Sequence, residues 1–251
     1  VSCLKYHNIF DKKNVQAFVS QYAHYKLITI PVPEGIWDGN NDVLGFIYQS
    51  LITEGDRNLT GQYYTNKRVV DYMTNEKNLA DGETFLDPCC GSGAFLLSVR
   101  TETPECLFGF DINPIAVMIT GVNLLVKYAD KDFIPQVYCL DFLKKNLFKA
   151  EREDIPLRFD NIYTNPPWGS DKNGFYGSDF PEIKSKERSS MVIVESLKRL
   201  NPNGNFCFLL PTSLLKIKNH HDVRKYILSN ASIQKIDLYS DRFDGVFTDY
   251  F

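Results

Sequence analysis

The chain has 251 residues, of which 43% are hydrophobic and 24% are charged, and its formal net charge is −3. These values are ordinary for a globular protein and suit one large domain with a small accessory segment. We find no apolar run of membrane-spanning length and no signal-peptide pattern, and we expect a cytoplasmic protein. The chain does not have the excess of Lys and Arg over Asp and Glu that is typical of nucleic-acid-binding domains. Either nucleic acid is not the substrate, or the basic surface lies in a segment or partner outside this chain.

The six cysteines form no C-x-x-C pair, and no His spacing suits zinc, so no metal site is expected. Most of them lie in apolar contexts, where Cys behaves as a small buried hydrophobic residue. This pattern favours a reduced, prokaryotic cytoplasmic protein.

Residues 1–60 predict a small helical N-terminal segment. Helical spacing of apolar residues is visible over 14–19 and, more clearly, over 42–52, where Asp42 is a suitable N-cap. A loop over 61–67 and a short helix over 68–73 follow.

From residue 84 onward the pattern alternates between strand and helix. Strands are expected at 84–86, 106–110, 136–140, 159–164, 205–210 and 233–238, with a seventh beginning at 248, and helices at 94–99, 114–128, 189–200 and 222–228. This alternation predicts an α/β fold with a doubly wound, mostly parallel, seven-stranded sheet, so 61–251 form one domain. Because the chain begins with Val and stops inside the seventh strand, we expect a fragment truncated at its C-terminus.

Four polar residues each follow a predicted strand directly, namely Asp87, Asp111, Asp141 and Asn165. The carboxyl ends of parallel strands meet at one edge of the sheet, where ligands bind. We therefore expect these four side chains to share one site.

A glycine loop follows Asp87, with the sequence Pro88-Cys89-Cys90-Gly91-Ser92-Gly93. Gly91 and Gly93 permit a positive φ and a close approach of the backbone to a ligand. The loop is neither the dinucleotide fingerprint nor a phosphate loop. Asp111 ends the next strand, where a carboxylate commonly accepts hydrogen bonds from ribose hydroxyls. A ligand with a ribose but without phosphate fits S-adenosylmethionine.

The segment Asn165-Pro166-Pro167-Trp168 begins where the fourth strand ends. Two consecutive prolines fix φ twice and remove two backbone donors, so the segment is rigid and extended. It can hold an amide, a free carbonyl and an indole around one flat ligand that carries an amine.

Taken together, these segments resemble the gamma-type N6-adenine DNA methyltransferases. The glycine loop resembles the cofactor loop of class I methyltransferases, and Asn165–Trp168 resembles the (D/N/S)-P-P-(Y/F/W) signature of amino-methyltransferases. Gly61–Thr65, followed by Val69–Met73, resembles the N-terminal cofactor motif. The same order occurs in methylase subunits of type I restriction-modification systems and in fused restriction-methylase enzymes. The family often has Pro after the Thr of this motif, whereas this chain has Asn66.

The resemblance implies a class I fold and assigns S-adenosylmethionine to one group of residues. Thr65 and the backbone near Tyr63 and Tyr64 would hold the methionine end, and Asp111 would bind the ribose. Ile112 would touch the adenine ring, and Asp141 would accept from its amino group. Asp87, Pro88, Gly91, Gly93 and Phe142 would shape the remainder of the pocket, and Asn165 borders it.

The resemblance also assigns a second group to an adenine flipped out of double-stranded DNA. Asn165 and the Pro166 carbonyl would accept from its exocyclic amine, Pro167 would keep this segment rigid, and Trp168 would stack on the base. Phe243 would cover the other face of the base, although a simple core role fits it nearly as well. A target-recognition domain or specificity subunit would lie outside this chain.

Three alternatives stay open at this point. The chain could methylate protein glutamine or ribosomal RNA, methylate N4 of cytosine (where Ser is usual instead of Asn165), or bind the cofactor as an inactive module. Cys89 and Cys90 invite a nucleophile interpretation, but they lie in the cofactor loop, and core packing is favoured. The adjacent His220 and His221 and the basic residues from Lys216 to Lys235 suit a solvated surface. We expect the fragment alone to bind cofactor without efficient methylation.

Overall fold

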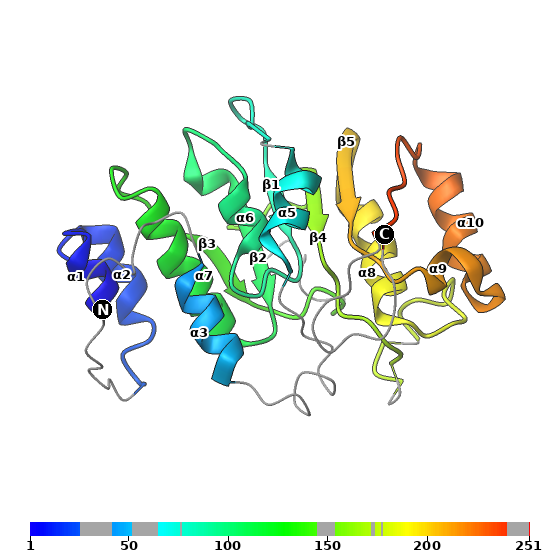
Figure 1. Ribbon diagram of the computed structural model, residues 1–251, viewed down its shortest axis with the longest axis horizontal. Coiled ribbons are helices and arrows are strands. Elements are labelled where there is room, and N and C mark those ends of the chain that lie inside the picture. The colour runs from blue at the N-terminus through cyan, green and yellow to red at the C-terminus, as the bar shows by residue number, and fades with distance from the viewer. Residues whose placement is uncertain are drawn as a thin grey trace.

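The computed structural model describes residues 1–25, 42–51, 65–75, 77–144, 154–171, 174–176, 178–239 and 251 (Figure 1). Within these ranges, a five-stranded sheet forms the centre of the molecule. Its strands are β1 (Phe85–Asp87), β2 (Leu107–Asp111), β3 (Gln136–Cys139), β4 (Phe159–Thr164) and β5 (Leu200–Phe208). All neighbours are parallel, in the order β3-β2-β1-β4-β5. The order reverses beside β1, so the carboxyl ends of β1 and β4 flank the switch point where open sheets bind ligands.

Neighbouring side chains in β1, and likewise in β4, enter two different hydrophobic clusters. Phe85 and Tyr163 pack into one cluster, whereas Leu86 and Ile162 pack into the other. This is the two-residue period of a strand. Because both faces of the sheet are covered, the strand sequences are nearly continuous apolar runs. Such runs allow strands to be predicted from the sequence.

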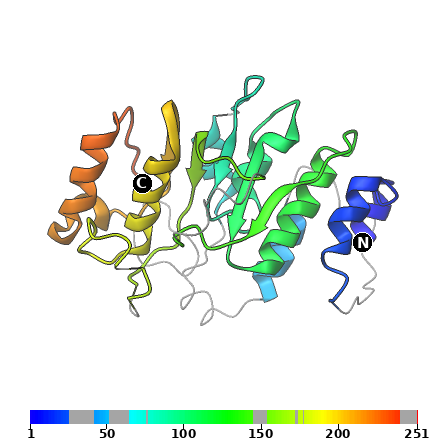
Figure 2. The same ribbon diagram turned by 180° about the vertical axis from the view of Figure 1, so that it is seen from behind.

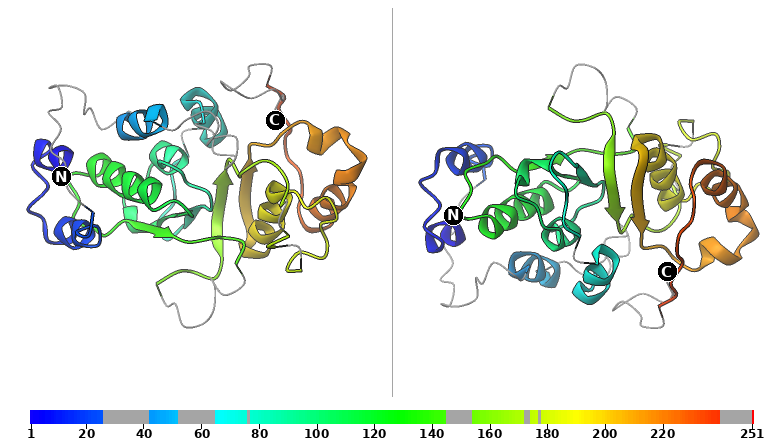
Figure 3. Two further views of the ribbon diagram at one scale, coloured as in Figure 1. Left: turned by 90° about the horizontal axis from the view of Figure 1, so that it is seen from below. Right: turned by 90° about the horizontal axis from the view of Figure 1, so that it is seen from above.

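Each cluster is completed by its own set of helices. The cluster that contains Phe85 takes side chains from α1 (Ser2–Tyr6), α2 (Lys13–Ser20), α5 (Lys67–Thr74), α6 (Ala94–Ser98) and α7 (Pro114–Lys127). The cluster that contains Leu86 takes them from α8 (Arg188–Arg199), α9 (Ser213–Lys216) and α10 (His221–Asn230). α3 (Val43–Leu51) lies beside α7, and η1 (Pro104–Cys106) and η2 (Lys218–His220) are short 3₁₀ turns. α1 and α2 lie at one end of the long axis and α10 at the other (Figures 1, 2 and 3).

The predicted helices and the first four strands agree with the structure within a few residues. β5 begins at Leu200 rather than Asn205, because its pairing with β4 continues across a register shift. Two helices, α1 and α9, were not predicted, and both are too short for apolar periodicity to show.

The sixth strand expected at 233–238 is wrong, since the described segment has no strand there. Its apolar side chains are exposed, including Leu238 at 67%, and its polar side chains contact α5 instead. Asp237 accepts a hydrogen bond from the Tyr72 hydroxyl at 3.1 Å. β-propensity alone therefore failed here, because a strand needs a neighbour to pair with.

The seventh expected strand lies outside the described residues except for Phe251, which exchanges two backbone hydrogen bonds of 2.7 Å with Leu210. The boundary expected between 60 and 61 also lies outside them, and the division into 1–60 and 61–251 stays a prediction. None of the helices in the described ranges combines the length and apolar character needed to cross a membrane.

The contact between α2 and α7 yields a test of this packing. A Cβ added at Gly121 would lie 2.1 Å from Cζ of the buried Phe18 ring. Alanine normally stabilises a helix interior relative to glycine by about 0.5–1 kcal/mol. We expect the opposite for Gly121→Ala, a loss of about 1–3 kcal/mol in the free energy of unfolding, because the ring must move. Urea denaturation measures this loss.

The double variant Gly121→Ala with Phe18→Leu is the matched control. It should lose less than the sum of the two single changes, because the smaller side chain leaves room for the new methyl group. Additive losses would contradict this packing of α2 on α7.

Candidate functional site

A pocket lies at the carboxyl edge of the sheet and collects residues from four successive strand ends. Its lining includes Gly91 from the loop after β1, Asp111 at the end of β2, and Asp141 and Asn165, which follow β3 and β4. Of the four strand-end residues expected to share one site, Asp111, Asp141 and Asn165 line this pocket, whereas Asp87 does not. Among the described residues, the pocket is lined by Tyr48, Pro88, Cys89, Gly91, Asp111, Ile112, Ala116, Leu140, Asp141, Phe142, Leu143, Asn165, Pro167, Tyr176, Arg188 and Val192.

Asp87 is buried and is not among the residues that line this pocket. Its side chain is 1% exposed and accepts a hydrogen bond from the Cys89 amide at 3.1 Å. Burial raises the pKa of Asp87 to about 7. The carboxylate thus shapes the start of the glycine loop from inside the core.

Gly91 and Gly93 both adopt the left-handed conformation, with φ of +52° and +97°. At Gly93 a Cβ would also lie 2.9 Å from Cγ2 of Thr120, so the close approach of α7 requires glycine there. The Gly91 amide donates to Asp111 at 2.9 Å, which ties the loop to the end of β2. The loop conformation thus depends on glycine in the two places that the sequence indicated.

Asp111 is held at both carboxylate oxygens. Oδ2 accepts from the Gly91 amide and Oδ1 from the Asn113 amide at 2.8 Å. Burial raises the pKa of Asp111, although these amides oppose the shift by favouring the charged form. Ile112, beside it, is 61% exposed at the pocket and presents an apolar surface there.

Asp141 is held in the same way at the end of β3. Oδ1 accepts from the Leu143 amide at 3.1 Å, and Oδ2 accepts from the Tyr176 hydroxyl at 2.6 Å. Phe142 lines the pocket and packs on Phe110, with ring centroids 6.2 Å apart. Two carboxylates therefore stand at fixed positions along the pocket wall.

Asn165 has one satisfied and one unsatisfied end. Its Nδ2 donates to the Thr65 hydroxyl oxygen at 3.1 Å, across 100 residues of sequence. Its Oδ1 is buried and receives no hydrogen bond from the described residues. Buried acceptors are rarely left unpaired, and an unpaired one is a candidate for ligand recognition.

The residues after Asn165 are fixed from both sides. The Trp168 indole nitrogen donates to the Leu209 carbonyl at 3.3 Å, and its ring packs beside Val69 and Leu209. Arg188 donates to the Trp168 carbonyl at 3.2 Å. Pro166 is buried, and Pro167 lines the pocket. The segment is thus rigid through its prolines and through its neighbours.

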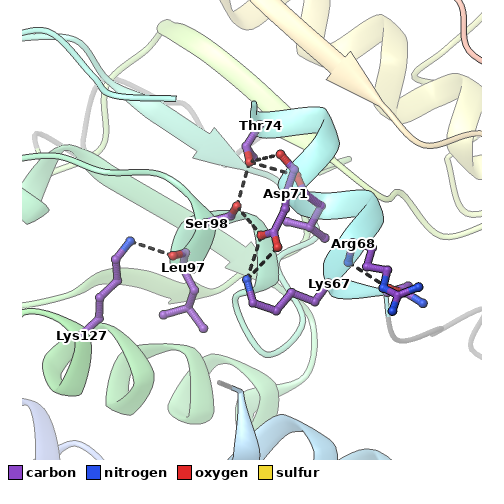
Figure 4. A network of polar contacts seen from close by, with 9 residues as sticks. Lys67, Arg68, Asp71, Thr74, Leu97, Ser98 and Lys127 are labelled. Atoms are coloured by element: carbon purple, nitrogen blue, oxygen red, sulfur yellow. Dashed lines mark hydrogen bonds and ion pairs between the residues drawn. The ribbon is translucent and has the colours of Figure 1, made fainter. Parts of the chain in front are cut away.

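The helix that begins just after Thr65, α5, is fastened to α6, the helix that follows the glycine loop. Ser98 of α6 donates to Asp71 of α5 at 3.1 Å and shares a hydrogen bond of 2.7 Å with Thr74 (Figure 4). Lys127 of α7 donates to the Leu97 carbonyl at 2.7 Å in the same network. Since α5 and α6 are joined, Thr65 and the glycine loop keep a fixed relation.

Three predicted site residues, Tyr63, Tyr64 and Phe243, lie outside the described residues. Conversely, Tyr48 and Tyr176 line the pocket without having been predicted. Tyr48 comes from α3 and accepts a hydrogen bond from the Asn113 side chain. No local pattern marks either tyrosine, because only the tertiary fold brings them to the pocket.

The two cysteines of the glycine loop are poorly suited to act as nucleophiles. Burial raises the pKa of both the Cys89 and the Cys90 thiol well above the usual value. The reactive thiolate form is therefore disfavoured. In the described part of the chain, no three His, Cys, Asp or Glu side chains gather in a way that could hold a metal ion.

A parallel sheet with a glycine loop after β1 and carboxylates at the carboxyl ends of β2 and β3 defines a class I methyltransferase fold. Residues 39–243 match the family model described as N-6 DNA Methylase. The chain belongs to this family.

Two curated relatives and one solved structure illustrate the similarity. The type II methyltransferase M.VspI of Vibrio sp. (strain 343) is 31% identical over 229 residues, which are 86% of this chain and 50% of the relative. The release factor glutamine methyltransferase of Chlamydia trachomatis serovar L2 is 30% identical over 122 residues, 48% of this chain and 36% of the relative. The modification subunit of a putative type I restriction enzyme from Vibrio vulnificus YJ016 has a TM-score of 0.53 at 22% identity, over 74% of this chain and 42% of that one. This chain thus spans half or less of the length of these relatives.

Asn66 is the N-cap of α5. It occupies the position where the family that the sequence resembles often has Pro. Its side chain accepts from the Arg68 amide at 2.9 Å, and its φ of −57° is one that proline adopts. We expect Asn66→Ala to cost about 1 kcal/mol of stability, because the capping bond is lost. Asn66→Pro should cost less, since a restricted unfolded chain returns about 0.4–1 kcal/mol. Thermal or urea unfolding checks both values.

Asn66→Ser is the control for this test, because serine caps a helix about as well as asparagine. Equal losses for the Ala and Ser variants would show that the cap contributes nothing.

Proposed function

We propose that this chain is the catalytic core of an S-adenosylmethionine-dependent DNA methyltransferase that acts on the exocyclic N6 amine of adenine. The observation that carries the proposal is the buried Asn165 Oδ1, which lacks a donor among the described residues. It borders a pocket whose wall holds two fixed carboxylates. An acceptor in this position suits an amine, which brings the N–H groups that Asn165 lacks.

The residues present fit S-adenosylmethionine. Asp111 keeps lone pairs for ribose hydroxyls after accepting two backbone amides, and Asp141 keeps lone pairs for an adenine amino group. The exposed Ile112 offers an apolar face to a purine ring, and Gly91 leaves the backbone open to close approach. Thr65 lies beside Asn165, toward the methionine end in this assignment. When bound, the cofactor supplies a methyl group on a positively charged sulfur.

The protein's own contribution is to orient and polarise the target amine. An aromatic exocyclic amine is a weak nucleophile, because its lone pair is delocalised into the ring. Asn165 Oδ1 and the Pro166 carbonyl would accept from its two N–H groups and favour a more tetrahedral nitrogen. Positioning of the amine lowers the barrier, and acceptors aimed at the developing charge lower it further. Trp168, whose ring is held by Leu209, would stack on the base.

The partner in this proposal is double-stranded DNA with the target adenine flipped out of the stack. The net charge of −3 is unsuited to tight DNA binding by this chain alone. We assign target recognition to a domain or subunit outside these residues, and a role in restriction-modification in a prokaryotic cytoplasm. The names of the Vibrio relatives, a type II methyltransferase and a type I modification subunit, support this role.

Methylation of protein glutamine is the second candidate. The similarity to the release factor methyltransferase favours it, but that match covers 48% of this chain. The N-6 DNA Methylase model spans residues 39–243 and includes the Thr65 segment. Incubation with radiolabelled cofactor, DNA and glutamine peptides separates the candidates, because label recovered as N6-methyladenine supports the first and label in peptide overturns it.

The two halves of the site should respond differently to mutation. Asn165→Ala should reduce methyl transfer at least a hundredfold, about 2.7 kcal/mol at 1.36 kcal/mol per factor of ten, with cofactor affinity changed less than threefold. Asp111→Ala should weaken cofactor binding tenfold or more, since ribose contacts are lost. Calorimetry gives the affinity. Single-turnover assays on mismatched DNA, where flipping costs less, give the rate.

Asn230→Ala, at the exposed end of α10, is the matched control and should leave both quantities unchanged. If Asn165→Ala abolished cofactor binding, the assignment of Asn165 to the target would be wrong. Efficient sequence-specific methylation by these 251 residues would contradict the placing of recognition outside them.

A further inference from the structure

A tyrosine outside the recognised motifs, Tyr176, contacts the Asp141 carboxylate. The Tyr176 hydroxyl donates to Asp141 Oδ2 at 2.6 Å, within the range of charge-assisted bonds between a hydroxyl and a carboxylate. Burial, and secondly the bond to Asp141, raises the pKa of Tyr176, so the hydroxyl keeps its proton and acts as the donor. Both residues line the same pocket.

Tyr176 is itself held in place by its own loop. The buried carboxylate of Asp171 accepts from the Phe175 amide at 3.1 Å and from the Tyr176 amide at 2.9 Å. The Asp171 amide donates to the Lys186 carbonyl at 2.7 Å, which anchors the loop to the segment before α8. The Tyr176 ring packs on the cluster that contains Leu86. The hydroxyl therefore meets Asp141 from a fixed backbone.

This loop continues directly from the segment that holds Asn165 and Trp168. Asp141 follows β3, whereas Tyr176 follows β4, and 35 residues separate them in sequence. One segment thus contributes both to the site assigned to the target amine and to the position of the carboxylate assigned to the cofactor.

We propose that Tyr176 is a positioning residue that fixes Asp141 for recognition of the 6-amino group of the cofactor's adenine. With Oδ1 held by the Leu143 amide and Oδ2 held by Tyr176, the carboxylate cannot rotate. Each oxygen accepts more than one hydrogen bond, so an amino group can still be bound. Without the Tyr176 hydroxyl, the Asp141 carboxylate can rotate about its remaining bond to the Leu143 amide. The preference for a ligand that carries the amino group then falls. The inference rests on the proposed cofactor site.

The test compares two ligands on the 251-residue chain by calorimetry. One is S-adenosylhomocysteine, and the other is its 6-deamino analogue, in which hydrogen replaces the amino group. A site that hydrogen-bonds an N–H group discriminates against a ligand without it, so the unmodified chain should prefer S-adenosylhomocysteine. Tyr176→Phe keeps the ring and should lower that affinity about five- to twentyfold, or about 1–1.8 kcal/mol at 1.4 kcal/mol per factor of ten. Affinity for the analogue should stay unchanged.

Tyr138→Phe is the matched control. It also removes a hydrogen-bonded hydroxyl, but one that donates to Gln136 on β3 and lies outside the pocket lining. It should preserve the preference between the two ligands. A purely structural role of Tyr176 would lower both affinities equally, and that result would overturn the inference, as would an unchanged or tighter affinity for S-adenosylhomocysteine.

The unmodified chain separates this inference from the proposed function. If it bound neither ligand, the proposed cofactor site would fail, and the inference with it. If it bound both ligands equally well, the cofactor site would stand, but Asp141 would not recognise the amino group and the role of Tyr176 would be rejected.

Discussion

The hydrogen bond between Asn165 and Thr65 decides which end of the Asn165 amide is available in the pocket. Because Nδ2 donates to Thr65, Oδ1 is left as an acceptor among the described residues. Thr65 precedes α5, and the bonds of Ser98 to Asp71 and Thr74 fasten α5 to α6. Asn165 in turn is placed by β4, which pairs with β1 at the switch point of the sheet. The contact thus depends on two separate parts of the fold.

Burial of carboxylates is the second constraint at this edge. Asp87 and Asp111 are desolvated, and burial raises the pKa of both groups. Backbone amides of Cys89, Gly91 and Asn113 supply the hydrogen bonds that water would otherwise supply. The glycine loop therefore does more than leave space for a ligand, since its amides also hold the carboxylates in place.

The sequence allowed prediction of those site residues whose position follows from strand ends. Asp111, Asp141 and Asn165 meet because parallel strands end at one edge, and a local pattern is sufficient to locate them. Tyr48 and Tyr176 could not be found in this way, since their places depend on how α3 and a loop fold back. The strand expected at 233–238 failed for a related reason. Its composition favours a strand, but pairing requires a neighbour that composition does not reveal.

Under the proposed function, the rigidity of the Asn165–Trp168 segment bears on where the free energy for binding DNA and flipping the base must come from. Thr65, Leu209 and Arg188 hold the segment in place, so little ordering is left for the moment of binding. Flipping a base costs a few kcal/mol, and stacking on one aromatic ring offsets about 1–3 kcal/mol of it. The site itself therefore contributes little net affinity for DNA. Phosphate contacts must supply the remainder, and with a net charge of −3 this chain is suited to the chemical step rather than to that grip.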